Sequence, residues 1–230
     1  MVIAGFRFKP LAIPACIMAL LLLLVAPLCL LLDLEKPIRF LYILNPFFFN
    51  YRSPVSWGAW LMVLYPLACL IYLYYLSKGD ELKAGILGGI TVPLALSVHA
   101  YTGFFFALVK TRSYWNTALM PGYFLTSAIL SGIALLMIVI LVRNKEKEVS
   151  LIDDLRKILV PVIAIDLFWA FSWILVLFHG MADARTATLH TISDPLWWFG
   201  EVILGMVIPL LILSHPATRK EPFWIKTSCL

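Results

Sequence analysis

The feature that most constrains this chain is a succession of six apolar runs, each about as long as a lipid bilayer is thick. A hydrocarbon core about 30 Å thick requires about 20 apolar residues in a helix that crosses it. Lipid offers the backbone no hydrogen-bond partners, so each run is expected to be helical. The sequence therefore predicts an all-α integral membrane protein with about six transmembrane helices. The predicted spans are residues 11–32, 56–77, 84–109, 117–142, 158–180 and 195–214.

The amino-acid composition supports the same class. Of the 230 residues, 62% are hydrophobic and 13% are charged, whereas soluble domains carry about 25% charged residues. A chain of this length cannot bury so much apolar surface in one core, so the excess is expected to face lipid. The net charge of +5 is better explained by basic loops than by nucleic-acid binding, and we expect no nucleic-acid partner.

The basic residues between the spans predict an orientation. With six spans, 12 of the 18 Lys and Arg residues fall on the side that holds both termini, and 6 fall on the other side. Lys and Arg are enriched on the cytoplasmic side. We therefore expect a multi-pass protein of the cytoplasmic membrane with both termini in the cytoplasm and with segments 33–55, 110–116 and 181–194 outside. The run at 11–32 is too long for the core of a signal peptide, so it is interpreted as the first membrane helix.

Three clusters of polar and aromatic residues interrupt the apolar background in the first half of the chain. DLEKPIRF at 33–40 follows the first span, and RSPVSWGAW at 52–60 opens the second. A longer segment, 98–132, covers the outer half of the third span, a basic and aromatic turn, and the start of the fourth span. Polar residues gathered at one end of several spans indicate a functional site there.

Taken together and in this order, the three segments resemble the NrfD/polysulfide-reductase family, the quinone-reactive membrane anchors of bacterial and archaeal respiratory complexes. The family typically shows a DLGRPxRF-like segment, an SPMSWGxW-like segment and a YTG…R…W…P…FLxSAxxSG pattern. The matching residues are Asp33, Leu34, Pro37, Arg39, Phe40, Ser53, Pro54, Ser56, Trp57, Gly58, Trp60, Tyr101, Thr102, Gly103, Arg112, Trp115, Pro121, Phe124, Leu125, Ser127, Ser131 and Gly132.

The sequence departs from the family pattern in two respects. Glu35 and Lys36 stand where the family usually has Gly and Arg. Family members also tend to have more spans than the six counted here. Compared with the family, the sequence lacks a helix before 11–32 and helices after residue 214. The chain is therefore expected to be a short variant, a truncated reading frame, or a subunit that another chain completes.

The resemblance implies an architecture and a role. The architecture is a single transmembrane domain, residues 1–230, with one four-helix bundle at 11–142 and two further helices at 158–180 and 195–214. The role is that of a membrane subunit in anaerobic respiration, with menaquinone or a similar quinone as substrate. A ferredoxin-like iron–sulfur subunit on the outer face, in a complex with further redox subunits, would exchange electrons with it. The resemblance implies no permanently bound prosthetic group in this chain.

Tyr101, His99, Asp33 and Arg39 are the predicted quinone-binding residues. Tyr101 and His99 lie about two to three turns from the outer end of the third span, where a polar group is costly and a functional role is expected. Both side chains can donate a hydrogen bond to a quinone carbonyl, but residues two positions apart point to different sides of a helix, so the two do not easily face one ligand. Asp33 and Arg39 flank a proline turn, and the resemblance places Asp33 near the quinone. A hydrogen bond between helices for His99, or a salt bridge for the Asp33–Arg39 pair, is the alternative interpretation.

Asp166 and Glu201 are isolated acids in the fifth and sixth predicted spans. Acids inside a membrane bundle commonly belong to proton paths, so both are candidates for one. A protonated acid that only hydrogen-bonds a neighbouring helix is the alternative interpretation.

Two other functions stay open from the sequence. A haem b cytochrome-type subunit needs paired axial histidines at matching depth, and only His99 lies deep in a predicted span. A transporter commonly shows internal repeats, and a structural anchor would need no buried Tyr or His. The four cysteines form no CxxC pair, so we expect no metal site.

Overall fold

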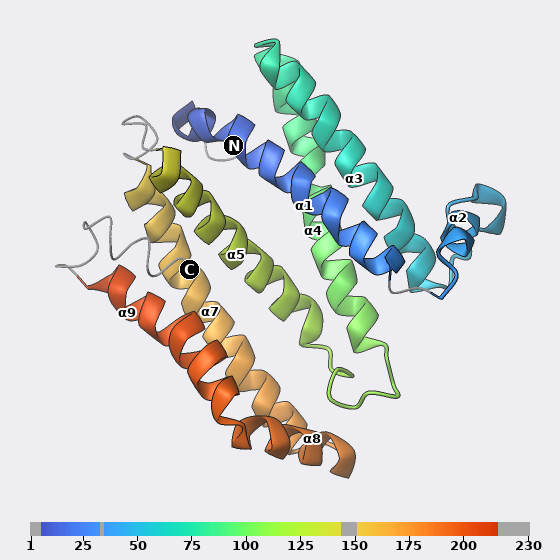
Figure 1. Ribbon diagram of the computed structural model, residues 1–230, viewed down its shortest axis with the longest axis vertical. Helices are drawn as coiled ribbons and strands as arrows, with labels where there is room; N and C mark the ends of the chain where they lie inside the picture. The colour runs from blue at the N-terminus through green and yellow to red at the C-terminus, as the bar shows by residue number, and fades with distance from the viewer. Residues whose placement is uncertain (1–5, 33–34, 144–150, 216–230) are drawn as a thin grey trace. The chain divides into compact units, whose positions relative to one another are not determined.

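The computed structural model describes residues 6–32, 35–143 and 151–215, and within these ranges every regular element is helical (Figure 1). Six of the described segments are long and apolar enough to cross a membrane. This confirms the predicted all-α integral membrane class. The helices that form these segments are α1 (Ala12–Leu32), α3 (Pro54–Ser77), α4 (Glu81–Ala107), α5 (Met120–Arg143), α7 (Ile152–Phe178) and the consecutive η4 (Trp197–Val207) and α9 (Ile208–Ser214).

The predicted spans agree with these helices to within about three residues at most of their ends. The largest difference lies at the start of α7, which begins at Ile152 rather than at residue 158. Its first turns are charged, and the sequence alone predicts a connection there. Arg156 and Lys157 each pair with Asp153, at 2.9 and 2.7 Å, and pairs at these spacings stabilise a helix. The helix therefore continues beyond the apolar run.

Shorter helices occupy parts of the segments that were predicted to lie outside the membrane. One of them, α8 (Ala182–Ser193), was not predicted from the sequence. Ala184 and Thr188 are buried on it, and the helix packs against α7. The remaining short elements are η1 (Phe6–Leu11), η2 (Pro37–Arg39), α2 (Phe40–Ile43) and η3 (Pro46–Phe48).

The turn between α3 and α4 depends on Gly79, whose φ of +75° lies in the left-handed region that favours glycine. Asp80 follows and accepts a hydrogen bond from the backbone N–H of Lys83, in the first turn of α4. That bond, together with the Lys83 ammonium, holds the pKa of Asp80 below its usual range. The local sequence therefore ends one helix and starts the next within a few residues.

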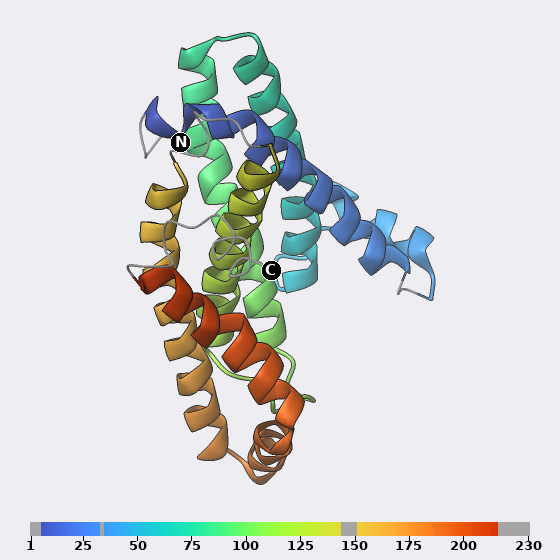
Figure 2. The ribbon, with the colours of Figure 1, turned by 60° about the vertical axis from the view of Figure 1, so that its left-hand side comes forward.

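The chain forms two compact units, Met1–Phe105 and Phe106–Leu230. In the first unit α1 packs against α3, and Cys16, Leu20 and Cys69 form a buried cluster there. Figure 2 shows the ribbon of α1 passing beside that of α3. In the second unit α5 and α9 both pack against α7. The most extensive packing that the structure describes for α5 is with α7. The fourth predicted span corresponds to α5, which belongs to the second unit. The predicted grouping of the first four spans into one bundle therefore stays a prediction.

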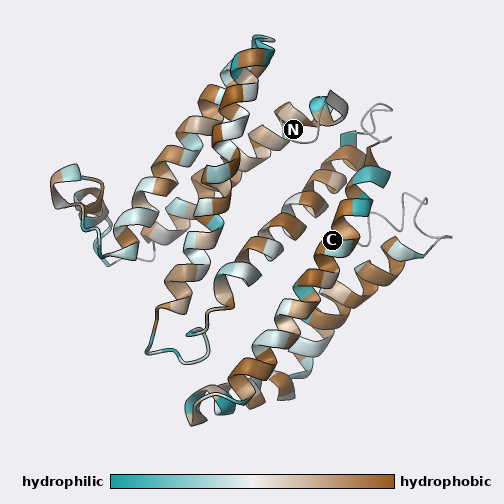
Figure 3. Cartoon of the chain, turned by 180° about the vertical axis from the view of Figure 1, so that it is seen from behind, coloured by the Kyte–Doolittle hydropathy of each residue, from teal (hydrophilic) through white to brown (hydrophobic). Residues whose placement is uncertain are grey.

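Apolar residues cover most of the length of the spans, and polar residues gather towards the helix ends and in the connections (Figure 3). On α1, for example, Leu21, Leu22 and Leu24 are each more than half exposed. Large exposed apolar side chains on long helices fit contact with lipid rather than with water.

Candidate functional site

The first unit contains the four residues that were predicted to contact a quinone. Asp33 lies outside the described residues. Arg39 ends η2, whereas His99 and Tyr101 lie in α4. The imidazole Nδ1 of His99 is 2.8 Å from the backbone oxygen of Ala95, one turn earlier in the same helix. A carbonyl only accepts, so Nδ1 carries the proton in this arrangement and Nε2 of the neutral ring is an acceptor.

The ring of Tyr101 lies directly against the backbone of Gly58 in α3. A Cβ atom at Gly58 would stand 2.0 Å from Cε1 and Cζ of Tyr101 and 2.3 Å from its hydroxyl oxygen. Only glycine leaves room for the ring at this point. The contact joins RSPVSWGAW to the YTG segment and holds the Tyr101 hydroxyl beside α3.

The Tyr101 hydroxyl has no hydrogen-bond partner among the residues that the structure describes. The hydroxyl oxygen is not fully buried, so a ligand can reach it and supply an acceptor, and the arrangement suits the predicted quinone role of Tyr101. The role itself stays a prediction.

The second unit contains a cavity of about 230 Å³ at the start of α5, the end of α7 and the start of η4. Its wall is mostly aromatic, and it carries one carboxylate. None of the described residues that line it is basic. The aromatic and acidic residues of the wall include Tyr114, Trp115, Tyr123, Trp173, Trp197 and Glu201.

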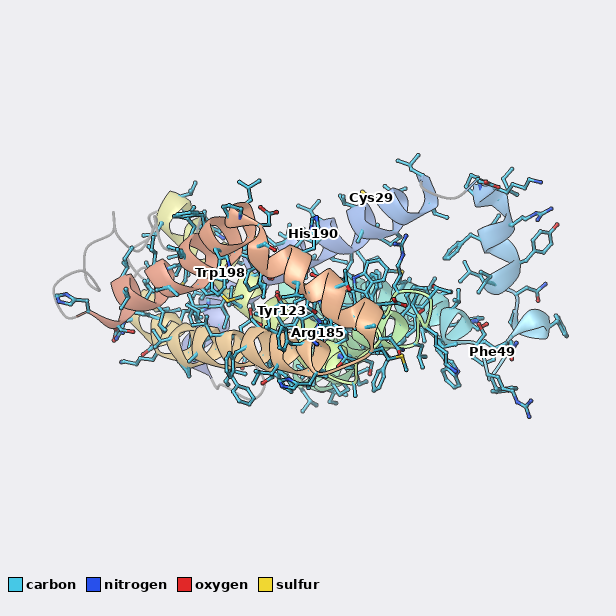
Figure 4. The ribbon with its side chains drawn as sticks, turned by 90° about the horizontal axis from the view of Figure 1, so that it is seen from below. Cys29, Phe49, Tyr123, Arg185, His190 and Trp198 are labelled. Atoms are coloured by element: carbon cyan, nitrogen blue, oxygen red, sulfur yellow. The ribbon has the colours of Figure 1, made fainter. Side chains whose placement is uncertain are left out.

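Two hydrogen bonds connect α5 to the two acids that were predicted as proton-path residues. Tyr123 donates its hydroxyl to Oε1 of Glu201 at 2.8 Å, and Oγ1 of Thr126 lies 2.8 Å from Oδ1 of Asp166. Tyr123 and Thr126 are three residues apart and therefore lie on one face of α5. In Figure 4 Tyr123 lies among the side chains between η4 and α7. The structure thus brings both predicted acids to one face of α5, and their part in a proton path stays a prediction.

Glu201 lies in η4, an 11-residue π-helix. A π-helix is wider than an α-helix and commonly marks functional sites. The start of η4 is fixed by Asp194, which accepts from the backbone N–H of Leu196, and by Trp198, whose indole donates to the Ile192 oxygen at 2.7 Å. The sequence predicted an apolar span here but gave no signal for the wider helix.

Tyr114 reaches the cavity from the connection before α5. Its ring meets that of Trp173 edge to face, with centroids 4.5 Å apart, and its hydroxyl lies 3.5 Å from Oγ1 of Thr191 in α8. Burial raises the pKa of Tyr114 above its usual value. The phenol therefore stays protonated at neutral pH and can act as a donor.

Sequence reasoning missed Tyr114, Tyr123 and Trp173. One available signal was the spacing of Tyr123 and Thr126, two polar residues about one turn apart inside a predicted span. The indole Nε1 of Trp173 is buried and has no hydrogen-bond partner among the described residues. It lines the cavity, so the cavity wall contains a donor that lacks an acceptor.

The comparisons with known proteins agree with the three sequence motifs. A sequence model of the family described as polysulphide reductase, NrfD, matches residues 3–230. The chain is 28% identical, over 95% of its length, to the Hdr-like menaquinol oxidoreductase integral membrane subunit of Archaeoglobus fulgidus, and covers 57% of that protein. It is 27% identical to a polysulfide reductase protein of Wolinella succinogenes, over 85% of this chain and 69% of the relative.

Protein NrfD of Escherichia coli is 24% identical over 80% of this chain and 66% of its own length. For three of the proteins that it resembles, the Archaeoglobus fulgidus subunit among them, this chain covers between roughly a third and just over half of their length. The family match nevertheless extends over nearly all of the chain. This protein therefore belongs to the NrfD/polysulphide reductase family.

Proposed function

We propose that this protein exchanges electrons between an iron–sulfur partner and a membrane quinone, with menaquinone or a similar quinone as substrate. The observation that carries the proposal is the Tyr101 ring, which lies against Gly58 with its hydroxyl unpaired among the described residues. A quinone carbonyl offers the acceptor that this hydroxyl lacks. One relative bears the name of a menaquinol oxidoreductase subunit, which supports the same substrate class.

In the proposed site Tyr101 donates a hydrogen bond to one quinone oxygen. His99 presents Nε2 as a proton acceptor for the quinol, because its Nδ1–H is held by the Ala95 oxygen. Arg39 and Asp33 complete the proposed set at the outer end of α1, and Asp33 lies outside the described residues. The residues of this chain would thus bind the ring and exchange its protons.

The electrons would come from or go to a partner subunit. We propose a ferredoxin-like iron–sulfur subunit on the outer face, within a complex that contains further redox subunits. In this proposal the chain holds no metal and no permanently bound cofactor of its own, and quinone is a substrate. Asp166 and Glu201, joined to α5 through Thr126 and Tyr123, are proposed as proton-path residues in the second unit.

Tyr101→Phe tests the quinone site because it removes one hydroxyl and keeps the ring on Gly58. We expect quinol turnover by the purified complex to fall about 10-fold or more, since a proton donor is lost. Assembly of the complex and reduction of the partner's clusters should stay at parent levels. The matched control is Tyr74→Phe, an exposed tyrosine in α3. If Tyr101→Phe turns over quinol at the rate of the control, Tyr101 is a packing residue and the proposed site is wrong.

The proposed orientation, with both termini in the cytoplasm, predicts opposite labelling at two positions. In a variant without native cysteines, Arg185→Cys should react with an impermeant maleimide in intact cells, because the proposed orientation puts α8, Ala182–Ser193, outside. Arg185 is exposed on α8, which makes it accessible. Glu146→Cys, at a position outside the described residues, should react only after the membrane is permeabilised. The reverse pattern would invert the topology and move the proposed partner to the other face.

A further inference from the structure

Two cysteines lie buried together between α1 and α3, in the first unit of the chain. Cys16 is 7% exposed and Cys69 is 4% exposed, and with Leu20 they form the apolar cluster between the two helices. The Cys16 thiol donates to the backbone oxygen of Cys69, with 3.5 Å between sulfur and oxygen. The two thiols also hydrogen-bond each other. The packing of α1 on α3 thus brings together two sulfurs that are 53 positions apart in the sequence.

A tyrosine hydroxyl completes the cluster. Tyr65 precedes Cys69 by about one turn of α3, so both side chains lie on the same face of that helix. The Tyr65 side chain packs against the cluster, and its hydroxyl hydrogen-bonds the Cys69 thiol. The Cys69 sulfur therefore has two donors within reach, the Tyr65 hydroxyl and the Cys16 thiol. Such donors stabilise the negative charge that a sulfur carries when it acts as a nucleophile.

Two other interpretations of the pair fit less well. Buried cysteines commonly act as small apolar side chains, but an apolar side chain needs neither a second thiol nor a hydroxyl at its sulfur. A structural zinc site needs about four ligands. No group of three or more His, Cys, Asp or Glu that could hold a metal ion occurs in the part of the chain that the structure describes. Two facing thiols are instead the reactants of a disulfide.

We propose that Cys16 and Cys69 are a redox-active dithiol, which hydrogen peroxide oxidises to a disulfide that joins α1 to α3. The Cys69 sulfur attacks one oxygen of the peroxide, the O–O bond breaks, and the thiol becomes a sulfenic acid as one water leaves. The Cys16 sulfur then attacks the Cys69 sulfur, and the sulfenic hydroxyl leaves with the Cys16 proton as a second water. The two thiols lose two electrons in all, and the peroxide is reduced to two waters.

The surroundings of the pair select the oxidant. Both sulfurs lie inside membrane spans among apolar side chains, where a charged oxidant would pay a large desolvation cost. Hydrogen peroxide is uncharged and little larger than water, so it enters such a place more readily than a bulky oxidant does. The proposal goes beyond the proposed function, because it uses none of the quinone-site residues and requires no quinone.

Counting the free thiols of the full chain in membranes tests the proposal. The chain has four cysteines, and each free thiol takes up one maleimide–polyethylene glycol group after denaturation, which shifts the band on a gel. After treatment with hydrogen peroxide, stopped with catalase, we expect two of the four thiols to be lost and dithiothreitol to restore them. Peptide mass spectrometry should identify the new bond as Cys16–Cys69. A treated parent chain without this bond overturns the proposal.

Cys16→Ser and Cys29→Ser are matched variants, because both positions lie in α1 and each variant keeps three of the four thiols. Cys29 is exposed further along the helix, where Figure 4 labels it. Cys29→Ser should still form the Cys16–Cys69 bond. In Cys16→Ser the sulfenic acid at Cys69 has no second thiol to meet, so dimedone should label Cys69. A label at Cys16 in Cys69→Ser, without label at Cys69 in Cys16→Ser, overturns the assignment of the attacking sulfur.

Tyr65→Phe tests the part of the hydroxyl group. It keeps the ring and removes the donor at the Cys69 sulfur, so the disulfide should form about 3- to 10-fold more slowly at the same peroxide concentration. The matched control is Tyr72→Phe, which alters another tyrosine packed against the same cluster, and it should keep the parent rate. Equal rates in the two variants overturn the role of Tyr65. The measurement on the parent chain decides the proposal itself if a variant does not fold.

Discussion

Gly58→Ala is expected to remove most of the quinol turnover although it adds a single methyl group. The new Cβ would stand 2.0 Å from two ring carbons of Tyr101, far inside van der Waals contact, so the ring or the helix must move. Overpacking of this kind costs about 1–3 kcal/mol of folding free energy. A displaced Tyr101 hydroxyl would also no longer meet the quinone. We therefore expect turnover to fall at least as far as in Tyr101→Phe.

Gly85→Ala in α4 is the matched control, because a Cβ there meets no atom within 4 Å. Alanine in place of glycine in a helix stabilises by about 0.5–1 kcal/mol where space allows. Gly85→Ala should therefore keep or slightly raise the thermal stability of the subunit and leave turnover unchanged. Gly58→Ala should lower both quantities relative to this control.

A double variant separates packing from function. Tyr101→Leu combined with Gly58→Ala removes the ring that the new methyl group would strike, so it should recover much of the stability lost in Gly58→Ala. It should not recover quinol turnover, because the hydroxyl is absent. A Gly58→Ala variant with parent stability and parent turnover would show that the Tyr101 ring is not held against Gly58.

The transmembrane helices were largely predictable because bilayer thickness fixes their length and lipid fixes their composition. The start of α7 could not be predicted in this way. Its first turns are stabilised by salt bridges between Asp153 and the basic residues that follow it, rather than by burial of apolar side chains. The helix α8 was missed for a related reason. It has no long apolar run, and it is placed by its packing against α7.

Some residues of the candidate site could be identified one by one from the sequence, but their arrangement and their partners on other helices could not. Tyr101 and Gly58 were both identified from their motifs, yet nothing in the sequence showed that the ring lies on the glycine. Asp166 and Glu201 were identified as isolated acids in apolar spans. Tyr123 pairs with Glu201 across 78 residues of sequence, and no local pattern reports such a contact. The cavity likewise depends on rings from several separate elements.

Asp166→Asn is expected to slow turnover about 100-fold if Asp166 carries protons, which is the lower end of the range for loss of an acid–base group. Asp166 is 3% exposed and its Oδ1 lies 2.8 Å from Oγ1 of Thr126. Asparagine has nearly the same shape and retains an oxygen that can meet Thr126, so packing should be preserved. The measurement is quinol oxidation by the complex in proteoliposomes, with a pH-sensitive dye to follow the protons.

Glu201→Gln should produce a loss of similar size, because Glu201 is proposed as the other carboxylate of the same path and bonds Tyr123 on the same face of α5. If the two acids act in one path, the double variant Asp166→Asn/Glu201→Gln should be little slower than either single variant, since residues that act as a unit are not additive. Asp183→Asn, in the first turn of α8 and outside the spans, is the control and should keep the parent rate.

Parent-like proton release in both single variants would show that these acids only join helices. Fully additive losses would show that they act in separate steps, and the single path through Tyr123 and Thr126 would then be wrong.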